Sequence, residues 1–247
     1  MIAAPPPLLH GKYLGLAAVF LVFHAYVPFA AWRARARLAG RAWLPPRARY
    51  LSNAIGTQVF FLAVAFGVAY ALRIPLYPRA LPRATDLLLG LAVLAALVAF
   101  MRPRWRRAVR KGDRRLYFFM PTGGREQGLW AALSLAAGFG EETTYRGVIY
   151  WILFALTGRW WLAGLLGALV FAGAHAFQSR TSMMLIFVFA LLFQALAIAT
   201  GALYVSMAVH ALYDVIAGFT YSRLGRELGY RVEGAPPAAA AGPAPAA

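Results

Sequence analysis

The chain has 247 residues, of which 62% are hydrophobic and only 13% are charged. Soluble domains usually contain about 45–50% apolar residues, so this composition excludes an ordinary soluble fold. The net charge of +17 comes from 25 lysines and arginines against eight acidic residues. Because the basic residues fall between apolar runs, we interpret them as loops facing anionic lipid and exclude nucleic acid as a partner. The absence of cysteine excludes disulfides, thiolate nucleophiles and Cys-ligated metal.

Seven apolar segments predict an all-α, polytopic bundle of transmembrane helices. They cover residues 13–32, 51–72, 86–101, 128–157, 160–178, 182–200 and 203–222. The fourth segment would be ~45 Å long as one helix, which exceeds a ~30 Å hydrocarbon core. We therefore expect it to tilt, protrude or break near Gly138 and Gly140. Two helices there would raise the count from about seven spans to eight.

Basic residues gather in alternate gaps between these segments, which predicts the orientation. With seven spans and the N-terminus outside, 19 of the 25 lysines and arginines lie inside and five lie outside, and Arg146 lies within a span. This asymmetry follows the positive-inside rule. We expect a multi-pass protein of the cell inner (plasma) membrane, in contact with membrane lipid, with a cytoplasmic C-terminus.

We divide the chain into four parts. They are a lead-in at residues 1–12, N-terminal transmembrane helices with basic loops at 13–127, a transmembrane core at 128–222, and a basic, then Ala/Pro-rich tail at 223–247. The composition of the tail predicts disorder from residue 234.

Two of the eight acidic residues are adjacent in the apolar fourth segment, as Glu141 and Glu142. A charge at the centre of a bilayer costs at least ~2.5–3.5 kcal/mol, so charges in a span indicate a functional site. Glu142 and Arg146 are four residues apart, in the order that favours an ion pair. Glu141 lies about 100° away on the helical wheel. We therefore assign Glu142 a structural role and Glu141 a chemical one, although a salt bridge that only fixes helix packing is the alternative.

Two histidines and an aspartate complete a polar set inside the predicted spans. His175 lies near the inner end of the fifth segment. His210 lies in the seventh, with Asp214 one turn away on the same face. An acid at that spacing can orient an imidazole and fix its tautomer. His24, in the first span without an acidic neighbour in sequence, is predicted to be a hydrogen-bonded core residue.

A carboxylate with two imidazoles supports two kinds of hydrolytic chemistry. Glu141, His175 and His210 can bind a divalent metal such as zinc, which would activate water. Alternatively, Glu141 is the general base for a water that the histidines and Asp214 position. Both require a polar cavity inside the bundle. Six glycines would allow the helices to approach closely around it: Gly138, Gly140, Gly147, Gly164, Gly167 and Gly173.

These residues form three motifs that resemble those of the CPBP intramembrane proteases, the CAAX-processing and bacteriocin-processing family also called Abi. The motifs are Glu-Glu-x-x-x-Arg at 141–146, Phe-x-x-x-His at 171–175 and His-x-x-x-Asp at 210–214. The resemblance covers about residues 128–222 and implies a helical membrane endopeptidase.

The resemblance also implies roles for individual residues. Glu141 would activate water, His175 and His210 would complete the site, and Glu142 with Arg146 would be the supporting pair. Asp214 stands where the family often has Asn, and its negative charge favours a cation or a charged imidazole.

The sequence favours a peptidase that cleaves a membrane-associated or lipidated protein or peptide. Two other classes stay open: a non-catalytic immunity or scaffold protein of the same fold, and a proton-coupled carrier, because intramembrane Glu, His and Asp chains also make proton relays. The substrate is not predicted, since a prenylated CAAX protein, a leader peptide and a C-terminal sorting signal all fit.

Overall fold

The computed structural model describes residues 12–39, 43–77, 81–232 and 235, and these are mostly helical. The elements are α1 (Lys12–Ala39), α2 (Arg47–Leu72), α3 (Ala84–Arg110), the 3₁₀ helix η1 (Arg114–Phe119), α4 (Gly123–Glu141), the π-helix η2 (Glu142–Ile149), α5 (Tyr150–Thr157), α6 (Trp160–Ala174), α7 (Arg180–Thr200) and α8 (Tyr204–Glu227). The described ranges contain no strand, which confirms the all-α prediction. The predicted lead-in up to residue 11 and the tail from residue 236 lie outside them.

Four of these helices are long and apolar enough to cross a membrane. They are α1, over its residues Tyr13–Arg35, together with α2, α3 and α7. Helix α6 is also apolar but shorter. The chain is therefore an integral membrane protein, and the count of seven or eight spans stays a prediction.

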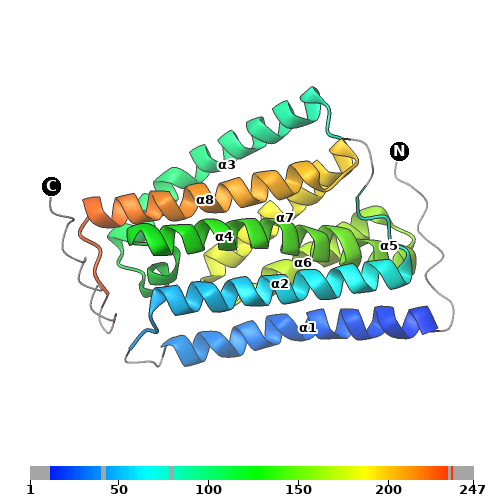
Figure 1. Ribbon diagram of the computed structural model, residues 1–247, viewed down its shortest axis with the longest axis horizontal. Coiled ribbons are helices and arrows are strands. Elements are labelled where there is room, and N and C mark those ends of the chain that lie inside the picture. Colours follow the sequence, from blue (N-terminus) through cyan, green and yellow to red (C-terminus); the bar gives the residue numbers. More distant parts are fainter. Residues whose placement is uncertain (1–11, 40–42, 78–80, 233–234, 236–247) are drawn as a thin grey trace.

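The helices pack so that α4 lies at the centre of the bundle. In Figure 1, α1, α2, α4 and α8 follow one another across the molecule with similar axes, and α3 lies beyond α8. Helices α6 and α7 pack against each other, and α6 also contacts α1. Both flanking helices of α4, α2 and α8, can therefore reach the side chains at its end.

Of the outcomes expected for the fourth apolar segment, a break is absent at Gly138 and Gly140, but the regular α-helix ends at Glu141, one residue after Gly140. Helix α4 continues to Glu141, and η2 and α5 follow without a gap. The π-helical turn is closed by a bond from the Tyr150 N–H to the carbonyl of Tyr145, five residues earlier. Such turns inside α-helices are rare and are frequent at functional sites.

Thr143 holds the first turn of the π-helix. Its hydroxyl donates to the Phe139 carbonyl at 2.6 Å, and it lies 2.5 Å from the Tyr77 hydroxyl. Because the Thr143 proton is already used, Tyr77 is the donor in this second bond. A threonine that bonds back to the preceding turn perturbs regular helix geometry, which is consistent with the change from α to π at this point.

Gly138 lets α4 approach α8 closely. A Cβ at this position would lie 2.8 Å from the Ala211 Cβ and 2.9 Å from both the Ala211 nitrogen and the Met207 oxygen. Two of these three atoms belong to the backbone of α8 and cannot rotate away. The close approach predicted for Gly138 is therefore present, and it sets the distance between Glu141 and α8.

The Gly138→Ala variant is expected to lose about 1–3 kcal/mol of stability, because α4 and α8 must separate to admit one methyl group. Gly56→Ala is the matched control, since a Cβ there meets nothing within 4 Å. Thermal unfolding of the two purified variants in detergent checks this expectation. Equal melting temperatures would show that the contact between α4 and α8 is not tight.

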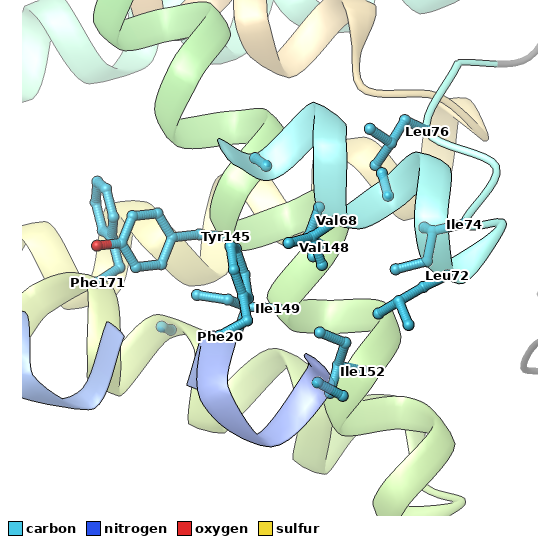
Figure 2. Packing of buried hydrophobic residues seen from close by; sticks show 14 of the residues in the cluster. Phe20, Val68, Leu72, Ile74, Leu76, Tyr145, Val148, Ile149, Ile152 and Phe171 are labelled. Atoms are coloured by element: carbon cyan, nitrogen blue, oxygen red, sulfur yellow. The ribbon is translucent and has the colours of Figure 1, made fainter. Parts of the chain in front are cut away.

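The opposite face of η2 is anchored in the largest apolar cluster. Tyr145, Val148 and Ile149 of η2 and Ile152 of α5 are buried there (Figure 2). They pack with Phe20 of α1, Val68 and Leu72 of α2, Ile74 and Leu76 of the following loop, and Phe171 of α6. The π-helix is thus held on one side by close packing while its first residue faces the polar site.

Arg47 ties the start of α2 to η1 and α4. Its Nε donates to the Tyr117 carbonyl at 2.6 Å, and its Nη1 donates to Thr122 Oγ1 at 2.9 Å and pairs with Glu126. The guanidinium also lies 4.2 Å from the centre of the Tyr117 ring, and the side chain is only 9% exposed. This cluster fixes the start of α2 against η1 and the first turn of α4.

The Arg47→Ala variant is expected to lose about 2–4 kcal/mol of stability, because Glu126 and the Tyr117 carbonyl lose their shared donor. Arg49, two residues later, is exposed. Its alanine variant is expected to stay within about 0.5 kcal/mol of the wild type. Chemical unfolding in detergent measures both. A small, equal effect of the two substitutions would show that the contacts of Arg47 with Tyr117 and Glu126 do not stabilise the fold.

Candidate active site

Three separate parts of the bundle bring the predicted site residues together. Glu141 and Glu142 lie at the junction of α4 and η2, His175 follows the end of α6, and His210 and Asp214 lie on α8. Helix α6 ends at Ala174, four residues before the approximate end of the predicted apolar segment at residue 178. The reason is local: His175 Nδ1 bonds the Phe171 carbonyl at 2.9 Å and so satisfies a carbonyl of the last turn.

His210 lies at the centre of the cluster. Its Nδ1 is 2.9 Å from Glu142 Oε1, and its Nε2 is 3.7 Å from Glu141 Oε2 and 3.6 Å from Asp214 Oδ2. The ring is buried and stacks on Phe193, with 5.2 Å between ring centres. Because Glu142 is the acceptor at Nδ1, that nitrogen carries a proton, and Nε2 faces Glu141 and Asp214.

The ion pair between Glu142 and Arg146, predicted from their spacing, is present. Arg146 Nη1 lies 3.2 Å from Glu142 Oε1, and the two side chains are 3% and 0% exposed. The guanidinium also lies 4.3 Å from the centre of the Phe171 ring. Glu142 Oε1 thus contacts both Arg146 and His210. This second contact crosses from η2 to α8, and helical spacing could not predict it.

Glu141 is the more accessible of the two acids, with a side chain 14% exposed. Its Oε1 accepts a hydrogen bond from Gln58 Nε2 at 2.7 Å, while Oε2 is the oxygen nearest His210. Sequence reasoning missed Gln58, which lies on α2 and outside the three motifs. An amide side chain within an apolar span is unfavourable unless it is hydrogen-bonded, and this could have indicated that Gln58 has a polar partner.

Asp214 lies beside His210, at the border of the site. Its carboxylate is 3.6 Å from His210 Nε2, beyond the usual hydrogen-bond distance, and its side chain is 31% exposed. The Trp130 Nε1 donates to the Asp214 carbonyl at 2.9 Å and so fixes this turn of α8 against α4. The tautomer of His210 is therefore set by Glu142. The spacing in the sequence had indicated Asp214 for this role.

Two cavities meet at the cluster. A cavity of about 230 Å³ lies among α3, α7, α8 and η1, and a larger one of about 450 Å³ lies among α1, α2 and α4. Glu141, His175 and Asp214 line both. The bundle thus contains the internal space that hydrolytic chemistry requires, on two sides of Glu141.

The predicted metal ligands do not fit a metal ion as they are placed. In the described ranges, no group of three or more His, Asp or Glu side chains is arranged to hold one. The bonds from the Nδ1 atoms of His210 and His175 to Glu142 and the Phe171 carbonyl do not decide this, because metal-binding histidines commonly make the same bonds and use Nε2 as the ligand. On the placement of the ligands alone, Glu141, His175 and His210 are not arranged as a zinc site.

His24 is a hydrogen-bonded core residue, as predicted. It is 2% exposed, and its Nδ1 lies 2.9 Å from the Phe20 carbonyl. The ring packs against those of Phe20, Phe61 and Tyr145. It also lines the larger cavity, on the wall formed by α1.

Comparison with known families identifies the part of the chain that carries the cluster. Residues 126–216 match the family model described as type II CAAX prenyl endopeptidase Rce1-like. The matched range contains all three motifs and confirms the family that they indicated. No curated protein and no solved structure gives a significant match.

Proposed function

We propose that this chain, whose residues 126–216 belong to the Rce1-like type II CAAX prenyl endopeptidase family, is an intramembrane endopeptidase that uses Glu141 to activate water. Its substrate is a membrane-associated or lipidated protein or peptide. The observation that carries the proposal is the position of Glu141, which faces His210 at the meeting point of two cavities.

In this mechanism, Glu141 is the general base. It takes a proton from a water molecule while the water oxygen attacks the carbonyl carbon of the scissile peptide bond. The electron pair of the carbonyl moves to its oxygen and forms a tetrahedral oxyanion. Glu141 then returns the proton to the leaving nitrogen, the C–N bond breaks, and the products are a new carboxyl terminus and a new amino terminus.

The two histidines stabilise the oxyanion. Each has its Nδ1 held by an acceptor, Glu142 for His210 and the Phe171 carbonyl for His175. The Nε2 atom of each ring is therefore available to the substrate. When the ring is protonated, this nitrogen donates a hydrogen bond to the oxyanion. Asp214 balances charge beside His210, while Arg146 holds Glu142 in the position that orients His210.

The site lies deep in the bundle rather than at its surface. Gln58, which contacts Glu141, is about 16 Å along α2 from Arg47, at ~1.5 Å per residue. This is roughly half of a ~30 Å hydrocarbon core. Basic residues flank the ends of α1 and α3 and the start of α2, which lie toward the left in Figure 1. These ends face the cytoplasm, with the N-terminus outside.

The test is a comparison of protein and peptide termini in membranes of cells with and without this chain. New termini are expected only where the chain is present, and the His210→Ala variant should not restore them. If no terminus depends on the chain, the proposal fails. A scaffold would leave His210→Ala without effect, and a carrier would instead move a solute across liposomes.

A further inference from the structure

We propose that the larger cavity, among α1, α2 and α4, is a hydration chamber that supplies Glu141 with the water it activates. The inference rests on the proposed hydrolytic function and adds a site to it. Hydrolysis inside an apolar bundle requires a route for water. The arrangement of polar groups in this cavity provides one.

The α2 wall of the chamber carries a row of polar side chains. Asn53 and Thr57 lie one turn apart, line the cavity and are exposed, and Gln58 follows beside Glu141. The row begins near the basic start of α2 and ends at the hydrogen bond from Gln58 to Glu141. Side chains on another face of the helix are apolar and exposed, as at Val59 and Phe60. One face of an otherwise apolar span is therefore suited to water.

Two buried polar atoms in the other walls call for a ligand. His24 Nε2 and Thr144 Oγ1 have no hydrogen-bond partner among the described residues, and both residues are 2% exposed. Both residues line this cavity. Leaving a buried polar atom unpaired costs about 1–3 kcal/mol, which a water bound between such groups recovers.

The cavity is large enough for several waters. Its volume of about 450 Å³ far exceeds the ~30 Å³ that one molecule occupies in the liquid. Glu141 is also part of the cavity wall. A water bound between the polar side chains of α2 and the Glu141 carboxylate is therefore already beside the oxygen that takes its proton. Gln58 contributes by fixing Oε1, which leaves Oε2 for the water.

The natural absence of cysteine allows a direct test in intact membranes. Single-cysteine variants Thr57→Cys and Val59→Cys lie at nearly the same depth on α2. A charged, water-soluble thiosulfonate reacts with thiolates in water and hardly with thiols in lipid. We expect Thr57→Cys to react at least about tenfold faster than Val59→Cys, because only a hydrated thiol ionises. Labelling in detergent after unfolding should show equal thiol content.

A kinetic test separates water from substrate as the occupant. His24→Phe and Thr144→Val replace the unpaired polar atoms by apolar groups of similar volume. Each is expected to lower kcat about tenfold, the effect of one lost hydrogen bond, with KM unchanged within about twofold. A raised KM with unchanged kcat would place the substrate in the chamber and overturn the inference. Unchanged melting temperatures control for folding.

The outcomes also distinguish this inference from the proposed function. Slow, equal labelling of the two cysteine variants in an enzyme that cleaves its substrate would overturn the hydration chamber alone. Rapid labelling of Thr57→Cys in a protein without any peptidase activity would overturn the proposed function, and the catalytic role of the chamber with it.

Discussion

The Glu141→Gln variant is expected to lose about 10²–10⁴ of its peptidase rate while remaining folded, because an amide cannot accept the proton of the attacking water. Glutamine has nearly the shape of glutamate, and its amide oxygen can still accept the hydrogen bond from Gln58. Its side chain is partly exposed, so the substitution leaves no deeply buried charge without a partner. The measurement is the initial rate of cleavage by reconstituted protein in liposomes.

Glu227→Gln is the matched control for this substitution. Glu227 lies at the end of α8, where it pairs with Arg223 at 3.3 Å, and both side chains are about half exposed. Such surface pairs contribute little, so the control should cleave at the wild-type rate. Retention of more than a small fraction of activity by Glu141→Gln would show that another group activates the water.

The Glu142→Gln and Arg146→Met variants are each expected to lose about 3–5 kcal/mol of stability, since each leaves one charge buried without its partner. Both side chains are almost fully buried, which distinguishes this pair from those at the surface. The double variant, Glu142→Gln with Arg146→Met, removes both charges and should recover part of the loss. Chemical unfolding in detergent of the four proteins gives the coupling energy directly.

Activity distinguishes a supporting role from a purely structural one. The double variant should remain inactive even where it regains stability, because His210 no longer has a carboxylate at Nδ1. A double variant that is both stable and active would show that Glu142 and Arg146 only fix helix packing. A Glu142→Gln variant as stable as the wild type would contradict the buried pair altogether.

Contacts that depend on local spacing could be predicted from the sequence. The ion pair between Glu142 and Arg146 follows from a separation of one helical turn, and the apolar segments mark where the helices lie. The order of the three motifs was sufficient to indicate the family of residues 126–216.

Contacts between helices could not be predicted in this way. Gln58 and Glu141 are 83 residues apart, and Glu142 and His210 are 68 apart, so neither contact has a spacing signal. The role of Gly138 is a related case. Its missing side chain serves the packing against Ala211 rather than a kink. Likewise, no spacing signal pairs Thr143, in the first turn of the π-helix, with Tyr77, which lies on a loop far earlier in the chain.

The predicted metal set illustrates a further limit of residue identity. Carboxylate and imidazole groups are suitable ligands, but the sequence does not show whether the fold groups three of them, and among the described residues it does not. The Glu142 carboxylate and the Phe171 backbone carbonyl bond the Nδ1 atoms of His210 and His175 and so fix the orientation of each ring. In the mechanism that we propose, the same residues serve proton transfer and oxyanion binding instead.

Water activation by Glu141 is tested most directly by cleavage in ¹⁸O-labelled water with protein that has been dialysed against a chelator. The reconstituted wild type is predicted to cleave at an unchanged rate and to place one ¹⁸O atom in the new carboxyl terminus, whereas Glu141→Gln forms no product. A rate that falls as metal is removed and returns when zinc is added would contradict this mechanism, as would labelled product from Glu141→Gln.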